Sequence, residues 1–151
     1  MKTTTLCYIR KNDCFLMLYR NKKENDLNAG KWIGVGGKCE PGETPEQCLL
    51  REVYEETGLT LTKFQSCGKI TFILDAWEDE ITYLYTADEY TGEINWDCNE
   101  GILKWVPIKE VLSLNLWEGD RLFLEKMTAG ESVDLWLHYD VNDVLAEAKF
   151  L

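Results

Sequence analysis

The most constraining feature of the sequence is a short acidic segment with complete signals for a capped helix. Thr44 is a good N-cap, Pro45 suits the first helical position, and Gln47 stands three residues after Thr44, as in a capping box. Gly58 is the residue type expected just after a helix C-terminus. The sequence therefore predicts a helix that begins at Pro45 and ends before Gly58.

This helix carries three glutamates that give it no stability. At about 100° per residue, Glu52, Glu55 and Glu56 fall within about one third of the circumference. Like charges one turn apart destabilise a helix by about 0.2–0.5 kcal/mol, and the macrodipole disfavours anions near the C-terminus. A solvated face is the simplest interpretation of surface glutamates. Oxygen ligands clustered without His or Cys also suit a hard divalent cation, so the cluster predicts a Mg²⁺ site.

The rest of the segment predicts how this helix is held. An apolar arc beside the glutamates should pack on the protein, and it comprises Leu49, Leu50, Val53 and Tyr54. A glycine-rich loop precedes the helix, where positive φ and close approach of the backbone to a pyrophosphate would be allowed. Its glycines are Gly34, Gly36, Gly37 and Gly42.

The spacing of residues 37 to 59 carries a family resemblance. A glycine is followed after five residues by a glutamate and after seven more by Arg-Glu, an aliphatic residue, a Glu pair, a glycine and an aliphatic residue. The nine matching residues are Gly37, Glu43, Arg51, Glu52, Val53, Glu55, Glu56, Gly58 and Leu59. They match every defined position of the Nudix box, and the chain resembles the Nudix hydrolases, which cleave a nucleoside diphosphate linked to another moiety.

The resemblance implies an α/β protein with the Nudix fold, a mixed β-sheet sandwiched between helices. It also implies a Mg²⁺ cofactor, with Mn²⁺ as a substitute, held by a backbone carbonyl near Gly36 and by Glu52, Glu55 and Glu56. Glu52 would deprotonate the attacking water, and Arg51 would orient the catalytic glutamate. Arg51 could instead pair with Glu55, one turn away.

A looser resemblance extends over residues 5 to 125 and concerns the substrate. Residues 29–32, 99–100 and 116–120 are similar to the MutT-type oxidised-purine nucleoside triphosphatases, which cleave 8-oxo-dGTP to the monophosphate and pyrophosphate and so sanitise the nucleotide pool ahead of DNA repair. This resemblance implies that Trp117 packs on a purine, Asp120 hydrogen-bonds its edge, and Glu100 is an additional metal or base group. Trp32 is a further candidate substrate contact, although both tryptophans could serve as core residues. Ile33 departs from the pattern, since some relatives carry Asn there.

Several functions stay open on the sequence. The substrate could be another dNTP, ADP-ribose or a dinucleoside polyphosphate. The chain could also be a non-catalytic nucleotide sensor, which would bind nucleotide without releasing product. Glu43 could be a structural partner of Arg51 or a group that supports the metal site.

Composition limits the remaining alternatives. With 151 residues and 45% hydrophobic content, the chain can bury one core, and a single domain over residues 1–151 is expected. No membrane span or signal peptide is evident, so a cytoplasmic location is expected. The net charge of −11 disfavours a nucleic-acid polymer as a partner but permits a small nucleotide escorted by Mg²⁺. The six cysteines show no CxxC spacing and are expected to be reduced thiols that bind no zinc. The protein is expected to be a monomer or a homodimer.

The pattern along the chain predicts strands alternating with a few helices. A polar loop over residues 21–31 should border the site, and the only histidine, His138, should be a strand residue. The expected strands are residues 3–10, 15–20, 69–74, 81–87, 101–106 and 132–139. The expected helices after the first are residues 108–112 and 118–128 and a short one from Asp143.

Overall fold

The first strand, β1 (Lys2–Lys11), joins the two halves of the sheet. It pairs with β2 (Cys14–Arg20) and β4 (Val35–Lys38) in antiparallel fashion and with β6 (Glu80–Thr91) in parallel. Asn12, with φ of 55°, makes the turn into β2. The computed structural model describes residues 1–151.

The sheet has nine strands, of both parallel and antiparallel pairing. Its main path runs in the order β3, β2, β1, β6, β5, β8, β9, with β4 against β1 and β7 against β2. The elements not yet given are β3 (Trp32–Ile33), α1 (Pro45–Thr57), β5 (Thr60–Leu74), β7 (Gly101–Pro107), α2 (Ile108–Val111), α3 (Glu118–Thr128), β8 (Val133–Tyr139) and β9 (Leu145–Phe150).

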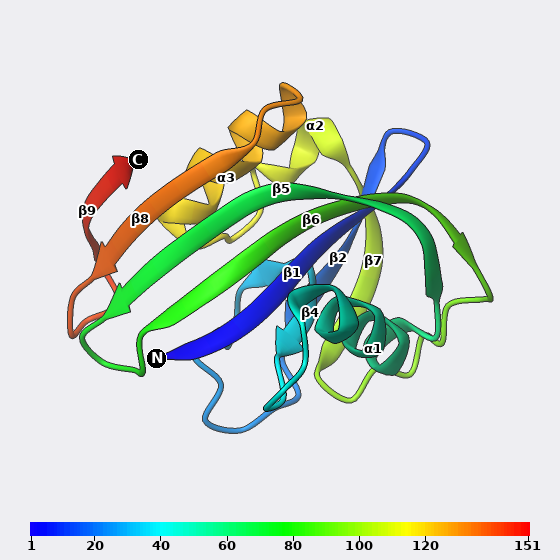
Figure 1. Cartoon of the computed structure of the whole chain (residues 1–151), viewed down its shortest axis with the longest axis horizontal. Helices are drawn as coiled ribbons and strands as arrows, with labels where there is room; N and C mark the ends of the chain where they lie inside the picture. The colour runs from blue at the N-terminus through cyan, green and yellow to red at the C-terminus, as the bar shows by residue number, and fades with distance from the viewer.

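Helices cover both faces of this sheet, and each face has its own apolar core. On one face α1 contributes Leu49 and Val53, and on the other α3 contributes Phe123 and Leu124. Figure 1 shows α1 in front of the strands, whereas β8 crosses in front of α3. The fold is therefore the expected α/β arrangement of a mixed sheet between helices.

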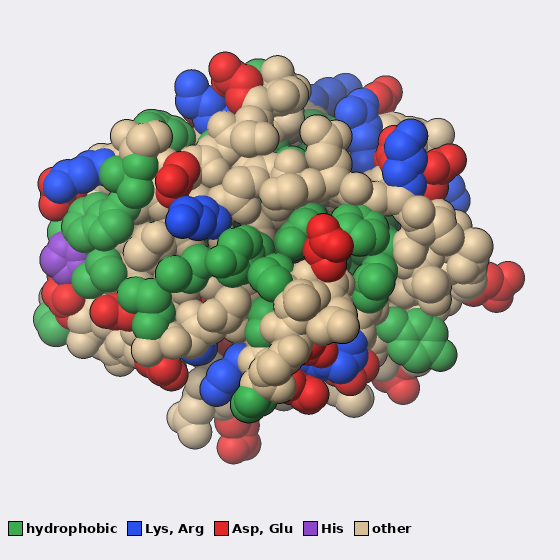
Figure 2. Space-filling model, in the orientation of Figure 1, with side chains coloured by type: hydrophobic (Ala, Val, Ile, Leu, Met, Phe, Trp, Pro, Cys, Tyr) green, Lys and Arg blue, Asp and Glu red, His purple; other side chains and the backbone are tan.

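The surface of this arrangement is mixed in character. Figure 2 shows acidic and basic side chains scattered around the rim and a broken band of hydrophobic side chains across the face that α1 partly covers. None of the helices is long and apolar enough to cross a membrane.

The signals at the ends of α1 act as the sequence predicts. The Thr44 side chain accepts a hydrogen bond from the Gln47 amide, the Gln47 side chain accepts one from the Thr44 amide, and Gly58 has φ of 80°. The predicted apolar arc is wrong in part, because Leu50 and Tyr54 are 38% and 60% exposed. The helix is rotated so that its buried face comprises Cys48, Leu49, Val53, Glu56 and Thr57.

The glycine-rich segment before α1 is only partly a loop, because Gly36 and Gly37 lie in β4 whereas Gly42 lies in the turn that follows. Residues of β4 pair with β1, and Gly36 opposes Leu6. A side chain at Gly36 would collide with the Thr5 carbonyl, so the glycine permits close approach of two strands. Only Gly36 and Gly42 of the four glycines have positive φ.

The predicted C-terminal helix is also wrong, because residues 145–150 form β9 against β8. Asp143 has φ of 59° and closes a turn in which the Asp140 carboxylate accepts hydrogen bonds from the amides of Asn142 and Val144. A helix of about eight residues is marginal alone, whereas a strand here completes its hydrogen bonds on a ready edge. The strands β5 and β6 extend well beyond the expected ranges.

Candidate active site

Arg51 lies at the centre of a cluster of carboxylates on α1 and the preceding turn. Its Nε and Nη2 donate to the two oxygens of Glu43 at 2.7 and 2.9 Å, and its Nη1 donates to Glu52 at 2.8 Å and to Glu55 at 3.2 Å. The Arg51 guanidinium and the Glu40 amide hold the pKa of Glu43 at about 2. Glu43 is thus a structural partner of Arg51, and Arg51 in turn fixes one oxygen of Glu52.

Glu56 is the most deeply placed of the helix carboxylates. It is 7% exposed, and its Oε1 accepts a hydrogen bond of 2.6 Å from the Gly36 amide. Its Oε2 is buried without a partner. Burial, reinforced by the neighbouring Glu100 carboxylate, raises the pKa of Glu56 well above its usual value. A carboxylate in this position needs either a proton or a cation.

Glu100 approaches Glu56 from the loop before β7 and is held by basic residues. Arg20 Nη1 lies 3.3 Å and Lys23 Nζ 3.7 Å from its two oxygens. Although burial opposes it, the pKa of Glu100 is lowered by the neighbouring carboxyl group of Glu56 and by these two cations. Glu56 and Glu100 thus form an unequal pair in which Glu56 retains the proton.

The residues fit a hard divalent cation. Glu56 contacts the Gly36 amide and has Glu100 as a neighbour, and a side chain at Gly37 would occupy the space of the Glu52 carboxylate. Burial raises the pKa of Glu52 despite its contact with Arg51. The unpartnered Glu56 oxygen and the raised pKa of Glu56 are the features that a bound cation would relieve.

A cleft of about 370 Å³ extends from these carboxylates. Glu52 and Glu100 line one part of it, and Trp117, Asp120 and Tyr139 line another. The Trp117 ring lies edge-on to Tyr139 at 5.1 Å between centroids, and Lys31 Nζ lies 5.1 Å from the Trp117 centroid. A flat apolar wall and a buried carboxyl group therefore share one cleft with the acidic cluster.

Asp120 is the unusual group in this part of the cleft. It is 3% exposed and lies in the first turn of α3. Burial raises its pKa to about 8, partly offset by Lys31. At neutral pH the side chain is therefore mainly a neutral acid, which can donate one hydrogen bond and accept others.

The loop of residues 21–31 borders the cleft, as the sequence predicts, and it connects the two parts of the cleft. Trp117 Nε1 donates a hydrogen bond of 2.8 Å to Asn28 Oδ1. The backbone N–H of Asn28 donates to the Asp26 carboxylate at 3.1 Å, and Arg20 Nε donates to the same carboxylate at 2.8 Å. Since Arg20 also holds Glu100, polar contacts run without interruption from the tryptophan to the acidic cluster. No sequence pattern marks Arg20 or Asp26, because their partners are set by the path of the loop.

Two of the predicted site residues, Glu55 and Trp32, make their contacts outside the cleft. Glu55 has a side chain 56% exposed and faces Arg51 rather than the cleft. Trp32 packs at 5.1 Å between ring centroids against Tyr19, and its neighbour Ile33 lines the cleft instead. A larger hollow of about 900 Å³ beside Arg10 contains no residue of the box, so volume alone does not mark the site.

Comparison with known proteins agrees with this geometry. The sequence profile of the NUDIX domain matches residues 2–127. An oxidized purine nucleoside triphosphate hydrolase of Danio rerio is 32% identical over 128 residues, which cover 84% of this chain and 81% of that protein. The uncharacterized Nudix hydrolase YvcI of Bacillus subtilis is 28% identical over 137 residues, covering 88% of this chain and 83% of that one.

Solved structures give the same result. A MutT protein of Methanosarcina mazei matches with a TM-score of 0.74 and 28% identity, over 85% of this chain and 94% of that one. A MutT protein of Bacillus halodurans matches with a TM-score of 0.89 over 99% and 97% of the two chains, and at 24% identity it shows the fold alone. The fold and the box define the class, and the chain belongs to the Nudix family. It is a Nudix hydrolase, in a family whose members use divalent metal ions.

Proposed function

We propose that the protein is a Mg²⁺-dependent pyrophosphohydrolase of nucleoside triphosphates, with 8-oxo-dGTP or a related oxidised purine nucleotide as its substrate. One observation carries the proposal: Glu52 of the box and Glu100 line a single cleft together with Trp117 and Asp120. Its relatives include an oxidized purine nucleoside triphosphate hydrolase, which supports the choice of base. The whole chain, residues 1–151, would act as one catalytic domain.

In this proposal the acidic end of the cleft holds the phosphates. Glu52, Glu56 and Glu100, with a carbonyl near Gly36, would hold Mg²⁺ there. Bound Mg²⁺ would neutralise charge that develops on the phosphates and orient the leaving group. Arg51 holds Glu52 in place through its 2.8 Å contact.

The chemistry is a hydrolysis with water as the nucleophile. Glu52 takes a proton from water, and the water oxygen attacks phosphorus. The α–β phosphoanhydride bond breaks, and the monophosphate and pyrophosphate leave. Arg51 and Glu43 would act by positioning Glu52, because neither side chain lines the cleft.

The other end of the cleft selects the base. Trp117 would stack on the purine, an interaction of about 1–3 kcal/mol per base. A mainly neutral Asp120 would exchange hydrogen bonds with the purine edge, which has both donors and acceptors. Ile33 lines the cleft and offers no such contact, so Asp120 would carry most of the edge recognition.

A substrate panel tests the proposal. The protein would be incubated with Mg²⁺ and normal and oxidised nucleoside triphosphates, ADP-ribose or a dinucleoside polyphosphate, and the products separated by chromatography. We expect repeated turnover, fastest on an oxidised purine triphosphate, with monophosphate and pyrophosphate in equal amounts. Saturable binding without product would identify a sensor, and faster release of product from ADP-ribose would reject the substrate proposed.

A further inference from the structure

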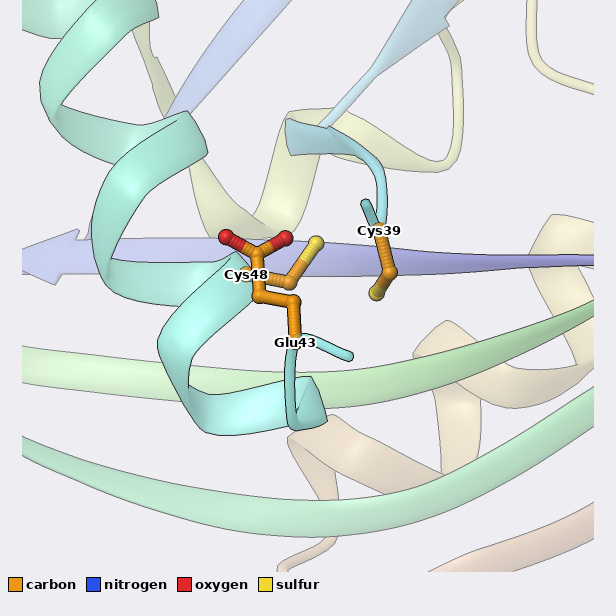
Figure 3. A group of neighbouring side chains, drawn as sticks. All are labelled: Cys39, Glu43 and Cys48. Atoms are coloured by element: carbon orange, nitrogen blue, oxygen red, sulfur yellow. The ribbon is translucent and has the colours of Figure 1, made fainter. Parts of the chain in front are cut away.

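Two thiols and a carboxylate meet beside Arg51, and the proposed reaction leaves both thiols unused. Cys39 lies in the loop after β4, and Cys48 lies in α1. Ligand atoms of Cys39, Glu43 and Cys48 all lie within 4.8 Å of one another. Figure 3 shows the Glu43 carboxylate beside Cys48, with Cys39 across from them. Neither cysteine occupies a defined position of the box, so the group belongs to this chain and not to the family motif.

The spacing of these atoms fits a soft metal ion. With Zn–S bonds of about 2.3 Å and Zn–O bonds of about 2.1 Å, a tetrahedral site places its sulfurs about 3.8 Å apart and sulfur about 3.6 Å from oxygen. The observed limit of 4.8 Å is within about 1 Å of these values, a movement that side-chain rotation can supply. Cys39 is partly exposed, so an ion can enter from solvent.

We propose that Cys39, Glu43 and Cys48 form a binding site for one thiophilic divalent cation of the Zn²⁺ class, with water as the fourth ligand. On binding, each thiol releases its proton to solvent and forms one metal–sulfur bond, and no oxidation state changes. Thr5 Oγ1, 3.4 Å from Cys48 Sγ, can donate a hydrogen bond to the bound thiolate. The CxxC spacing absent from the sequence is replaced by the contact of a loop with a helix.

The site of Cys39, Glu43 and Cys48 and the carboxylate site of the cleft would bind different classes of cation. Thiolates favour Zn²⁺ and similar ions, whereas carboxylates and carbonyls favour Mg²⁺. The sites are also linked, because Glu43 holds Arg51 and Arg51 holds Glu52. A cation bound by the Glu43 carboxylate would weaken the contact of Glu43 with Arg51. Arg51 would then hold Glu52 less firmly, and Mg²⁺-dependent turnover would fall.

Cadmium titration tests this site without any substrate. The full chain, reduced with a phosphine and kept in excess Mg²⁺ to occupy the oxygen ligands, would be titrated with Cd²⁺ while sulfur-to-cadmium charge-transfer absorbance is recorded. We expect saturation at one equivalent. Loss of a group that only supports a metal ligand costs about 10–100-fold in affinity. Cys39→Ser removes a ligand itself and should weaken Cd²⁺ binding by more than that. Cys14→Ser is the matched control, since Cys14 is also partly exposed but lies outside the group, and it should bind like the parent.

The result that would overturn the proposal is equally direct. Absence of the absorbance in the parent, its retention in Cys39→Ser, or its loss in Cys14→Ser would each reject the site. Cys39→Ser changes a partly exposed loop residue, and circular dichroism would verify its fold. Turnover with Mg²⁺ alone should be the same in Cys39→Ser and the parent, and only the parent should be inhibited by low Cd²⁺. The absorbance does not depend on hydrolysis, so it can fail or succeed independently of the proposed function.

Discussion

Glu56 shows how burial makes one carboxylate different from its neighbours. It lies on the packed face of α1, where a charge is costly, with one oxygen on the Gly36 amide and the other unpartnered. Its neighbour Glu55 has the same chemistry but lies in solvent beside Arg51. Substitution of Glu55 is therefore a control for substitution of Glu56, because both changes remove one carboxyl group but only Glu56 lies at the site.

Glu56→Gln should abolish turnover while leaving the metal-free fold intact. Gln still accepts from the Gly36 amide and cannot ionise at this buried position, so the free energy of unfolding without metal should be unchanged or higher. We expect turnover to fall by more than about 100-fold, because a direct cation ligand is lost. Steady-state kinetics and urea unfolding in chelator measure the two effects. Glu55→Gln is the control, and a Glu56→Gln rate within about tenfold of the parent would exclude Glu56 as a ligand.

Asp120→Asn should change how stability depends on pH. The pKa of Asp120 is raised from the usual 3.8 to about 8, so between these values the folded protein holds a proton that the unfolded chain loses. The free energy of unfolding that this proton contributes is fully present below about pH 4 and is lost as pH rises towards 8. The loss is about 1.4 kcal/mol per pH unit for one proton. Asn carries no such proton. Urea unfolding at pH 5, 6 and 7 should show the parent losing stability relative to the variant, and parallel curves would contradict the raised pKa.

At the scale of elements, α1 supports the site through its N-terminal cap. Thr44→Ala removes the acceptor for the Gln47 amide and should lower the free energy of unfolding by about 1 kcal/mol. Thr128→Ala is a suitable control, because its hydroxyl only donates back to Glu125 within α3 and its loss should cost less than about 0.5 kcal/mol. Both values come from urea unfolding. Equal losses would show that the capping box contributes nothing special.

The ends of α1 could be predicted because a cap is written in adjacent residues. The strands β4 and β9 could not, since each depends on a partner strand elsewhere in the chain. Gly36 pairs against Leu6, and residues after Asp143 pair back onto β8. The rotation of α1 that exposes Tyr54 and buries Glu56 also comes from packing on the sheet, which a helical wheel alone does not specify.

For the whole molecule, the ion pair of Arg20 and Asp26 attaches the cleft loop to the sheet. The two side chains are 9% and 5% exposed, and breaking such a pair leaves a buried charge. Asp26→Ala should therefore destabilise the protein by about 3 kcal/mol, at the lower end for buried pairs because Arg20 keeps Glu100.

Asp13→Ala provides the comparison for that prediction. It breaks the exposed pair of Arg10 and Asp13, whose side chains are 53% and 97% exposed, and should cost about 0–1 kcal/mol. Urea unfolding measures both variants. In addition, Asp26→Ala should raise KM for 8-oxo-dGTP. The backbone N–H of Asn28 loses its acceptor in this variant, so Asn28 no longer holds the Trp117 ring in a fixed position. Similar small losses in both variants would contradict a structural role for the loop anchor.

The sequence predicts the box glutamates because their spacing on one helix is local. It identifies Trp117 and Asp120 only through family resemblance, since nothing nearby shows that they share a cleft with Glu52. The set of polar contacts through Arg20 and Asp26 depends on a loop crossing the cleft, and no periodicity encodes that path.

The most direct test of the account crosses two variants with two substrates. Turnover of 8-oxo-dGTP and dGTP would be measured as kcat/KM for the parent, Asp120→Ala and Glu56→Gln. We expect Asp120→Ala to lose about ten- to a hundredfold on 8-oxo-dGTP with a much smaller loss on dGTP, because a hydrogen bond to the base is worth about 1–3 kcal/mol. Glu56→Gln should lose activity on both substrates alike. An unchanged ratio of 8-oxo-dGTP to dGTP turnover in Asp120→Ala would contradict base reading by Asp120 and point to another nucleotide substrate.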